Sequence, residues 1–253
     1  MPKTDPPFLC LITPVFDPAL ESLTKLVAAV KKQTLGDFIH VMVSNGPSPA
    51  IKGFIANIAR DDPRFIYDEI EEEPTGDSIA ILLNLGKRRN YAMKNYEAVR
   101  YLFLDSDLKI LDNDYFRKLH LAHAEIKRDV FVTQVQYAGR SKMVTLPIFP
   151  IQHSRLDIAN YCFTRAIAET YNYPTDYIGV FNDYRFFSMI ATEHNTAILD
   201  FVSAERDGNA SHTRLSESYR EERKEPPPPR AGALTILTRH IHAAFLEIRN
   251  REK

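Results

Sequence analysis

Two aspartates one residue apart, Asp105 and Asp107, are the most chemically suggestive pair in this sequence. They directly follow residues 101–104, an apolar and aromatic run typical of a buried β-strand. In open α/β sheets ligands bind at the carboxyl ends of strands, where two carboxylates suit a metal ion or a polar ligand. Asp-Ser-Asp is also typical of turns and helix N-caps, so the local pattern leaves both interpretations open.

Three consecutive basic residues, Lys87, Arg88 and Arg89, precede this strand. They are the most concentrated positive charge in the front half of the chain. Guanidinium groups match phosphate oxygens in bidentate contacts, so an arginine here is a candidate for binding an anionic ligand. A basic run on a helix is also typical of a solvent-exposed face.

Composition limits the class of protein. The 253 residues suffice for one sizeable α/β domain, with or without an appendage. The 32 basic and 33 acidic residues balance, which argues against a nucleic-acid-binding protein. Cys10 and Cys162 lie in apolar runs and are predicted to be buried thiols in a reducing compartment. We find no signal-peptide pattern and no apolar stretch near the ~20 residues that span a bilayer, so we expect a cytoplasmic protein.

The elements that must position these residues alternate in the first half of the chain. Apolar runs predict strands, and apolar side chains at three- and four-residue spacing predict helices between them. The predicted strands are residues 8–16, 38–43, 64–67, 101–104 and 130–137, and the helices 20–30, 51–60, 85–99 and 112–124. This alternation favours an α/β fold with a parallel sheet.

The second half of the sequence is less regular. Strands are predicted at residues 160–164, 177–181 and 197–202, helices at 165–171 and 184–192, and an extended edge segment with two prolines at 145–151. Residues 216–230 are charged and end in four prolines, which is typical of a linker or lid. Residues 231–253 predict a C-terminal helix whose final part is basic, a candidate for peripheral membrane contact.

Taken in order, these segments resemble the nucleotide-sugar-binding half of the GT-A glycosyltransferases, closest to family 2. The motifs are Thr-Pro-Val-Phe after the first strand, Ser-Asn-Gly-Pro-Ser after the second, Arg-Asn on the helix and Leu-Asp-Ser-Asp after its strand, within residues 8–110. The later Asn-Asp-Tyr-Arg-Phe-Phe matches more loosely. The resemblance implies a Rossmann-like, mostly parallel central sheet flanked by helices, with a smaller acceptor-side β segment and a C-terminal helix.

The resemblance also implies a division of the chain. One GT-A catalytic domain would cover residues 1–215, with a nucleotide-sugar-binding half at 8–110 and an acceptor-binding half at 111–215. The linker or lid at 216–230 and the helix at 231–253 would follow it.

The activity that the resemblance implies is transfer of a sugar from a nucleoside diphosphate donor to a hydroxyl acceptor, with Mn²⁺ or Mg²⁺ on the diphosphate. A hard divalent ion held by carboxylates neutralises the leaving diphosphate. Asp107 then corresponds to the metal ligand and Asp105 to a contact with the donor. His212, in a turn-rich segment after the last strand, corresponds to a second metal ligand, although a lone loop histidine is most often simply exposed.

Other donor contacts carry over by position. Thr13, Pro14 and Val15 end the first strand where the resemblance places the nucleoside. Asn45 stands where the family commonly has an aspartate, which leaves the base open, with a uridine donor favoured. Arg89, directly before an asparagine, corresponds to the arginine that approaches the diphosphate.

Inverting transfer requires a carboxylate that deprotonates the acceptor hydroxyl. Asp183 follows the apolar segment predicted as a strand, opens a helix, and matches the family's catalytic acid, with Asn182 in place of a first acid. Helix N-capping is the alternative for Asp183.

Two other functions of the protein remain open. A sugar-phosphate nucleotidyltransferase would normally carry a glycine-rich loop where this chain has Pro14 and Pro18, and a catalytically silent nucleotide-sugar-binding protein would normally have lost a ligand carboxylate.

Overall fold

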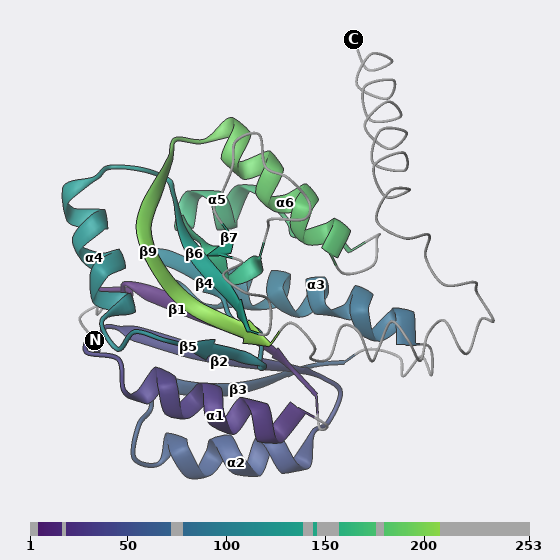
Figure 1. The fold of residues 1–253 in the computed structure, drawn as a ribbon. Helices are drawn as coiled ribbons and strands as arrows, with labels where there is room; N and C mark the ends of the chain where they lie inside the picture. Colours follow the sequence, from purple (N-terminus) through teal and green to yellow (C-terminus); the bar gives the residue numbers. More distant parts are fainter. Residues whose placement is uncertain are drawn as a thin grey trace, which may run out of the picture. The chain divides into compact units, whose positions relative to one another are not determined.

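A computed structural model describes residues 5–16, 19–71, 78–138, 144–145, 157–175 and 180–207. All of them belong to a compact unit, Met1–Ser211, and the second unit, His212–Lys253, contains none. The described strands form one sheet in the order β3-β2-β1-β4-β8-β6-β9-β5, with β7 paired to β6 (Figure 1). No described helix is long and apolar enough to cross a membrane.

The first half of the chain is a parallel, Rossmann-like arrangement, as predicted. Its strands are β1 (Leu9–Val15), β2 (Phe38–Asn45), β3 (Phe65–Ile70) and β4 (Arg100–Phe103). β1 pairs in parallel with both β2 and β4, and β2 pairs in parallel with β3. The connecting helices are α1 (Leu20–Lys31), α2 (Pro49–Ala59) and α3 (Ser78–Asn95). Parallel strands joined by helices place their carboxyl ends at one edge of the sheet.

The second half adds mixed pairing. It comprises β5 (Leu108–Ile110), α4 (Tyr115–Glu125), β6 (Val130–Ala138), β7 (Val144–Thr145), the 3-10 helix η3 (Ile158–Asn160), β8 (Tyr161–Thr164), α5 (Arg165–Thr170), α6 (Val180–Glu193) and β9 (Thr196–Asp207). β8 lies antiparallel between β4 and β6, whereas β6 and β9 are parallel. β5 pairs antiparallel with β9 and sets Leu108 opposite Arg206.

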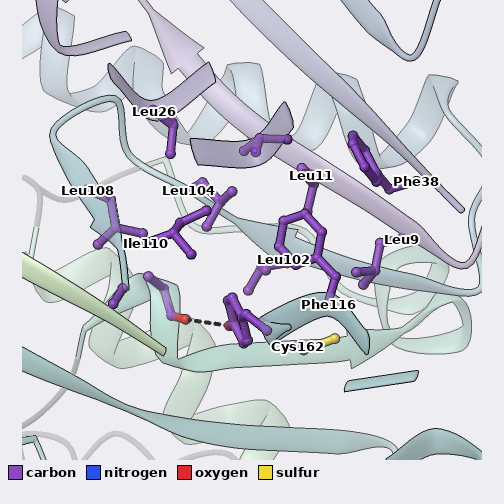
Figure 2. Packing of buried hydrophobic residues seen from close by; sticks show 14 of the residues in the cluster. Leu9, Leu11, Leu26, Phe38, Leu102, Leu104, Leu108, Ile110, Phe116 and Cys162 are labelled. Carbon is purple, nitrogen blue, oxygen red and sulfur yellow. Dashed lines mark hydrogen bonds between the residues drawn. The ribbon is translucent and has the colours of Figure 1, made fainter. Parts of the chain in front are cut away.

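Helices cover both faces of the sheet, which explains why the central strands are apolar throughout. Along β1, Leu9 and Leu11 face a cluster with α1, α2 and α4, whereas Cys10 and Ile12 face a cluster with α3, α5 and α6. This is the two-residue alternation of a strand buried on both sides. Figure 2 shows the first cluster, in which Leu9, Leu11, Leu102, Leu104, Phe38 and Phe116 are labelled.

Several elements differ from the prediction; α3, for example, runs from Ser78 to Asn95, whereas the helix was predicted at 85–99. The strand predicted at 177–181 is wrong at its end, because α6 begins at Val180. β9 runs to Asp207, well beyond the predicted end at residue 202, and β5 was not predicted because three residues carry little periodicity. The predicted linker at 216–230 and helix at 231–253 lie outside the described residues.

Candidate active site

Asp105 and Asp107 lie in the turn that joins β4 to β5, beyond the carboxyl end of β4. The backbone N–H of Leu108 donates to the carbonyl of Asp105 at 3.1 Å, so the turn interpretation is correct for the backbone. The next helix, α4, begins only at Tyr115, so neither carboxylate caps a helix. Both carboxylates are partly exposed and bind guanidinium groups instead.

Arg89 links the pair to the predicted base. Its Nη2 donates to Asp105 Oδ1 at 2.9 Å and its Nη1 to Asp183 Oδ1 at 3.4 Å, while its own side chain is only 4% exposed. A buried guanidinium requires opposite charge, and here two carboxylates from distant parts of the chain supply it. The structure thus brings Arg89, Asp105 and Asp183 together.

Arg206, near the end of β9, is a site residue that the sequence analysis missed. Its Nη2 donates to Asp105 Oδ2 at 2.9 Å and its Nη1 to Asp107 Oδ1 at 3.2 Å. Its Nε lies 2.7 Å from Asp157 Oδ2. Burial lowers the pKa of Arg206, but the carboxylates of Asp157, Asp105 and Asp107 outweigh that effect and raise its pKa overall. Sequence reasoning missed Arg206 because the last strand was predicted to end at residue 202, whereas β9 continues to Asp207.

Asp157 is the second missed residue, and it anchors Arg206. Its side chain accepts from the backbone N–H of Ala159 as the N-cap of η3, and Tyr137 Oη donates to it at 2.9 Å. The capping pattern Asp-Ile-Ala-Asn was readable from the sequence, but it indicates a cap and not a site.

The site carries more negative than positive charge among the described residues that form it. Four carboxylates, those of Asp105, Asp107, Asp157 and Asp183, face the two guanidiniums of Arg89 and Arg206. An excess of carboxylate repels an anionic ligand and attracts a cation. The arrangement therefore suits a ligand that arrives together with a positive ion.

The carboxylate of Asp183 lies in the first turn of α6, not at its N-cap. Tyr173 Oη donates a hydrogen bond to Asp183 Oδ1, the oxygen that also accepts from Arg89. Among the described residues, Oδ2 has no hydrogen-bond partner. Burial raises the pKa of Asp183, which Arg89 and the Tyr173 hydroxyl partly offset, so Asp183 is a better proton acceptor than an ordinary aspartate.

The predicted nucleoside residues differ in what their side chains do. Thr13 and Val15 are buried, and Thr13 Oγ1 lies 2.8 Å from His40 Nε2, so the side chain of Thr13 belongs to the core of the sheet. Pro14 is buried as well. Asn45 ends β2, and its Oδ1 is buried without a hydrogen-bond partner in the described part of the chain.

The basic run on α3 divides into three roles. Arg88 is buried and its Nη1 donates to the carbonyl of Val15 at 2.6 Å, which fixes the end of β1. Arg89 faces the carboxylates, and Lys87 is exposed. The interpretation of this run as a solvent-exposed face is therefore wrong for both arginines.

Of the predicted metal ligands, the described residues include Asp107 but not His212. No three His, Cys, Asp or Glu side chains of these ranges converge on one point. Asp105 and Asp107 offer hard oxygen donors, and Mg²⁺ is commonly held by one or two carboxylates together with substrate phosphates. The donor set therefore fits an ion shared with a diphosphate ligand. His212, the other predicted ligand, lies outside the described residues.

No protein-family model matches the sequence, and no curated protein matches it either. Solved structures do match. The S. aureus TarS fragment 1–349 in complex with UDP-GlcNAc is 17% identical, with a TM-score of 0.63 over 85% of this chain and 64% of that chain. The same fragment with UDP gives a TM-score of 0.65 at 15% identity, over 85% of this chain and 70% of that one.

A second structure supports the same fold. The mannosyltransferase PcManGT from Pyrobaculum calidifontis, in complex with GDP-Man and Mn²⁺, is 15% identical with a TM-score of 0.56, over 89% of this chain and 67% of that chain. This chain spans only 42% of a longer TarS chain. Together these similarities show that the described residues adopt the GT-A glycosyltransferase fold, as the sequence predicted.

Proposed function

We propose that this protein is a glycosyltransferase that moves a sugar from a nucleoside diphosphate donor to a hydroxyl acceptor with inversion. The observation that carries the proposal is the convergence of Asp105, Arg89 and Asp183 at the carboxyl edge of a GT-A sheet, where α/β folds bind ligands. The structural neighbours were solved with UDP, UDP-GlcNAc and GDP-Man, which supports a nucleotide-sugar donor.

The nucleoside would lie beside the loop after β1, at residues Thr13, Pro14 and Val15, and against the end of β2. Because the side chains of Thr13 and Val15 are buried, these residues would contact the nucleoside through their backbone at the end of β1. The unpartnered Oδ1 of Asn45 would accept from a ring N–H of the base. Uracil and guanine both carry a ring N–H that could make this hydrogen bond. We favour a UDP-sugar as the substrate that donates the sugar.

Around the diphosphate, Asp107 would hold Mn²⁺ or Mg²⁺, with Asp105 contacting the donor and His212 as a further ligand. When bound, the ion supplies positive charge to the leaving diphosphate. The excess carboxylate charge of the site supports this proposal, because a diphosphate alone would be repelled. Arg89 adds fixed positive charge, and its buried Nε–H has no partner among the described residues and would suit a ligand oxygen.

Asp183 would act as the general base. Its Oδ1 is held by Arg89 and Tyr173, and Oδ2 would accept the proton of the acceptor hydroxyl as that oxygen attacks the anomeric carbon. The C–O bond to the diphosphate breaks on the opposite face, so the anomeric centre inverts. The proton ends on Asp183, and the diphosphate leaves with the electron pair of the broken bond.

The test measures donor binding and turnover separately. A panel of UDP-GlcNAc, UDP-glucose and GDP-mannose is screened with and without Mn²⁺ by thermal shift, since a ligand that binds the native state raises Tm. Release of nucleoside diphosphate, by transfer or by slow hydrolysis, reports turnover. We expect Asp183→Asn to keep the Tm shift and to lose turnover by about 10²- to 10⁴-fold.

Two further variants complete this test. Asp107→Ala is expected to lose the Mn²⁺-dependent part of the Tm shift as well as turnover, and Asp200→Asn, at an exposed position of β9, is the control that should change neither. A wild-type protein whose Tm no nucleotide sugar moves, and which releases no diphosphate, would refute the proposal. Binding without release would favour a silent binding protein, and pyrophosphate formed from a nucleoside triphosphate and a sugar 1-phosphate would favour a nucleotidyltransferase.

Location also remains a proposal. We propose a cytoplasmic protein whose C-terminal segment, residues 231–253, makes peripheral contact with a membrane through its basic residues. Flotation of the full chain with anionic liposomes at low and high salt measures this directly. Absence of binding at low salt would contradict it.

A further inference from the structure

One tyrosine, Tyr173, contacts both the proposed base and the arginine beside it. Its hydroxyl donates to Asp183 Oδ1, and the guanidinium carbon of Arg89 lies 4.8 Å from the centre of its ring. The side chain is buried, and Phe103 and Phe186 pack around the ring at centroid distances of 5.9 and 5.3 Å. Tyr173 has few free rotamers in such a setting, so its hydroxyl is fixed in space.

The segment that carries Tyr173 has no regular secondary structure, and α3 holds it in place. Asn90 Nδ2 donates to the carbonyl of Tyr173 at 2.9 Å, and the backbone N–H of Tyr173 donates to Asn90 Oδ1 at 2.7 Å. One amide side chain thus makes the paired contacts that a neighbouring strand would make. These two hydrogen bonds fix the position of the Tyr173 backbone along α3, next to Arg89, the residue before Asn90.

Gly86, one turn earlier on α3, allows this close approach. A Cβ at this position would lie 2.7 Å from the carbonyl oxygen of Pro174 and 2.9 Å from Cδ1 of Tyr173. Backbone atoms cannot yield easily at such distances, so any side chain at position 86 would push the Tyr173 segment away from α3. Gly86, Arg89 and Asn90 therefore present one surface of the helix to one tyrosine.

We propose that Tyr173 is the positioning residue of Asp183: its hydroxyl fixes Oδ1, its ring fixes Arg89, and Oδ2 is thereby left to face the acceptor. This inference rests on the proposed function of Asp183. A general base that is itself oriented by a third group is a recurring arrangement in enzymes. Here the third group contacts both the base and the arginine that pairs with it.

The decisive variant is Tyr173→Phe, which keeps the ring and removes only the hydroxyl. Tyr171→Phe is the matched control, because the Tyr171 hydroxyl binds Glu193 at 2.7 Å on the exposed surface. With UDP-GlcNAc or GDP-mannose as the donor, whichever is turned over, we expect Tyr173→Phe to lower kcat about 10- to 100-fold and to leave the donor KM within about twofold. The control should match wild type.

A pH profile separates positioning from a purely structural role. The Tyr173 hydroxyl lowers the pKa of Asp183, so its loss should move the acid limb of kcat to higher pH, whereas a structural defect would lower kcat at every pH alike. A wild-type rate with an unmoved acid limb would overturn the inference. So would a rise in donor KM as large as the fall in kcat.

Two measurements separate this inference from the proposed function. In a double-mutant cycle of Tyr173→Phe and Asp183→Asn, the two losses of Tm should not add, whatever the protein catalyses; additive losses would overturn the contact itself. Gly86→Ala should reproduce the kcat defect by displacing the segment, with Gly53→Ala on α2, where an added Cβ meets nothing within 4 Å, as its control. Normal kcat in Gly86→Ala would count against the inference, and failure of wild type to turn over any donor would instead refute the proposed function.

Discussion

At the scale of single residues, Asp183 combines two properties that a base requires. Burial disfavours the charged form of Asp183 and raises its pKa, and Arg89 and the Tyr173 hydroxyl partly offset that rise. The same oxygen, Oδ1, receives both contacts, so orientation and charge are controlled at one atom. In the proposed reaction the other oxygen, Oδ2, would accept the proton.

This balance predicts a pH dependence of turnover. Asp183 must be deprotonated to act, so kcat should be constant at high pH and fall about tenfold per pH unit below its pKa. Because that pKa is raised, the fall should begin above the ordinary aspartate value of 3.8. Initial rates across pH, with Tm followed in parallel to exclude unfolding, measure this; a limb at or below the ordinary value would contradict the burial argument.

At the scale of elements, α3 organises the site. Consecutive residues of this helix reach different parts of the fold: Arg88 the end of β1, Arg89 the carboxylates, and Asn90 the Tyr173 segment. A rigid helix keeps these three contacts in register. A displacement of α3 would therefore disturb the end of β1, the carboxylates and the proposed base together.

Arg88 and Lys87 provide a matched test of this role. Arg88→Ala removes a buried charged hydrogen bond to the Val15 carbonyl and should lower the free energy of unfolding by about 2–3 kcal/mol. Lys87→Ala, at an exposed neighbouring position, should change it by less than about 0.5 kcal/mol. Urea denaturation of the two variants measures the difference, and equal losses would show that Arg88 does not anchor β1.

At the scale of the whole molecule, the two apolar clusters on either face of the sheet hold the strand ends in position. Each central strand contributes alternate side chains to the two clusters, so neither face can loosen without disturbing the other. Cys10 faces one cluster and Cys162 the other, and both are free thiols buried in the core, as predicted.

The two thiols therefore report the integrity of both faces. Burial raises the pKa of Cys162 to about 11 and that of Cys10 as well, so little reactive thiolate is present at neutral pH. We expect neither thiol to react with an aromatic disulfide reagent in the native protein and both to react in guanidinium. Rapid reaction of one thiol in the native state would indicate that its face of the sheet opens locally.

The sequence alone determined the order of strands and helices in the first half and the position of Asp105 and Asp107 at a strand end. These features depend on local apolar periodicity, which can be read from each segment of the sequence by itself. It also singled out Arg89 and Asp183, although only through resemblance to a family. It misjudged the start of α6, because a short apolar run before a helix has no period of its own.

Only the tertiary structure decided which groups meet. Arg206 reaches Asp107 across 99 residues because β5 pairs with β9 and sets Leu108 opposite Arg206, a register that neither strand reveals by itself. Tyr173 lies in an irregular segment with no sequence signal, and contacts from Gly86 and Asn90 place it. Local patterns thus specify the elements, whereas long-range pairing and close packing specify the carboxylate and guanidinium contacts on which the proposed chemistry depends.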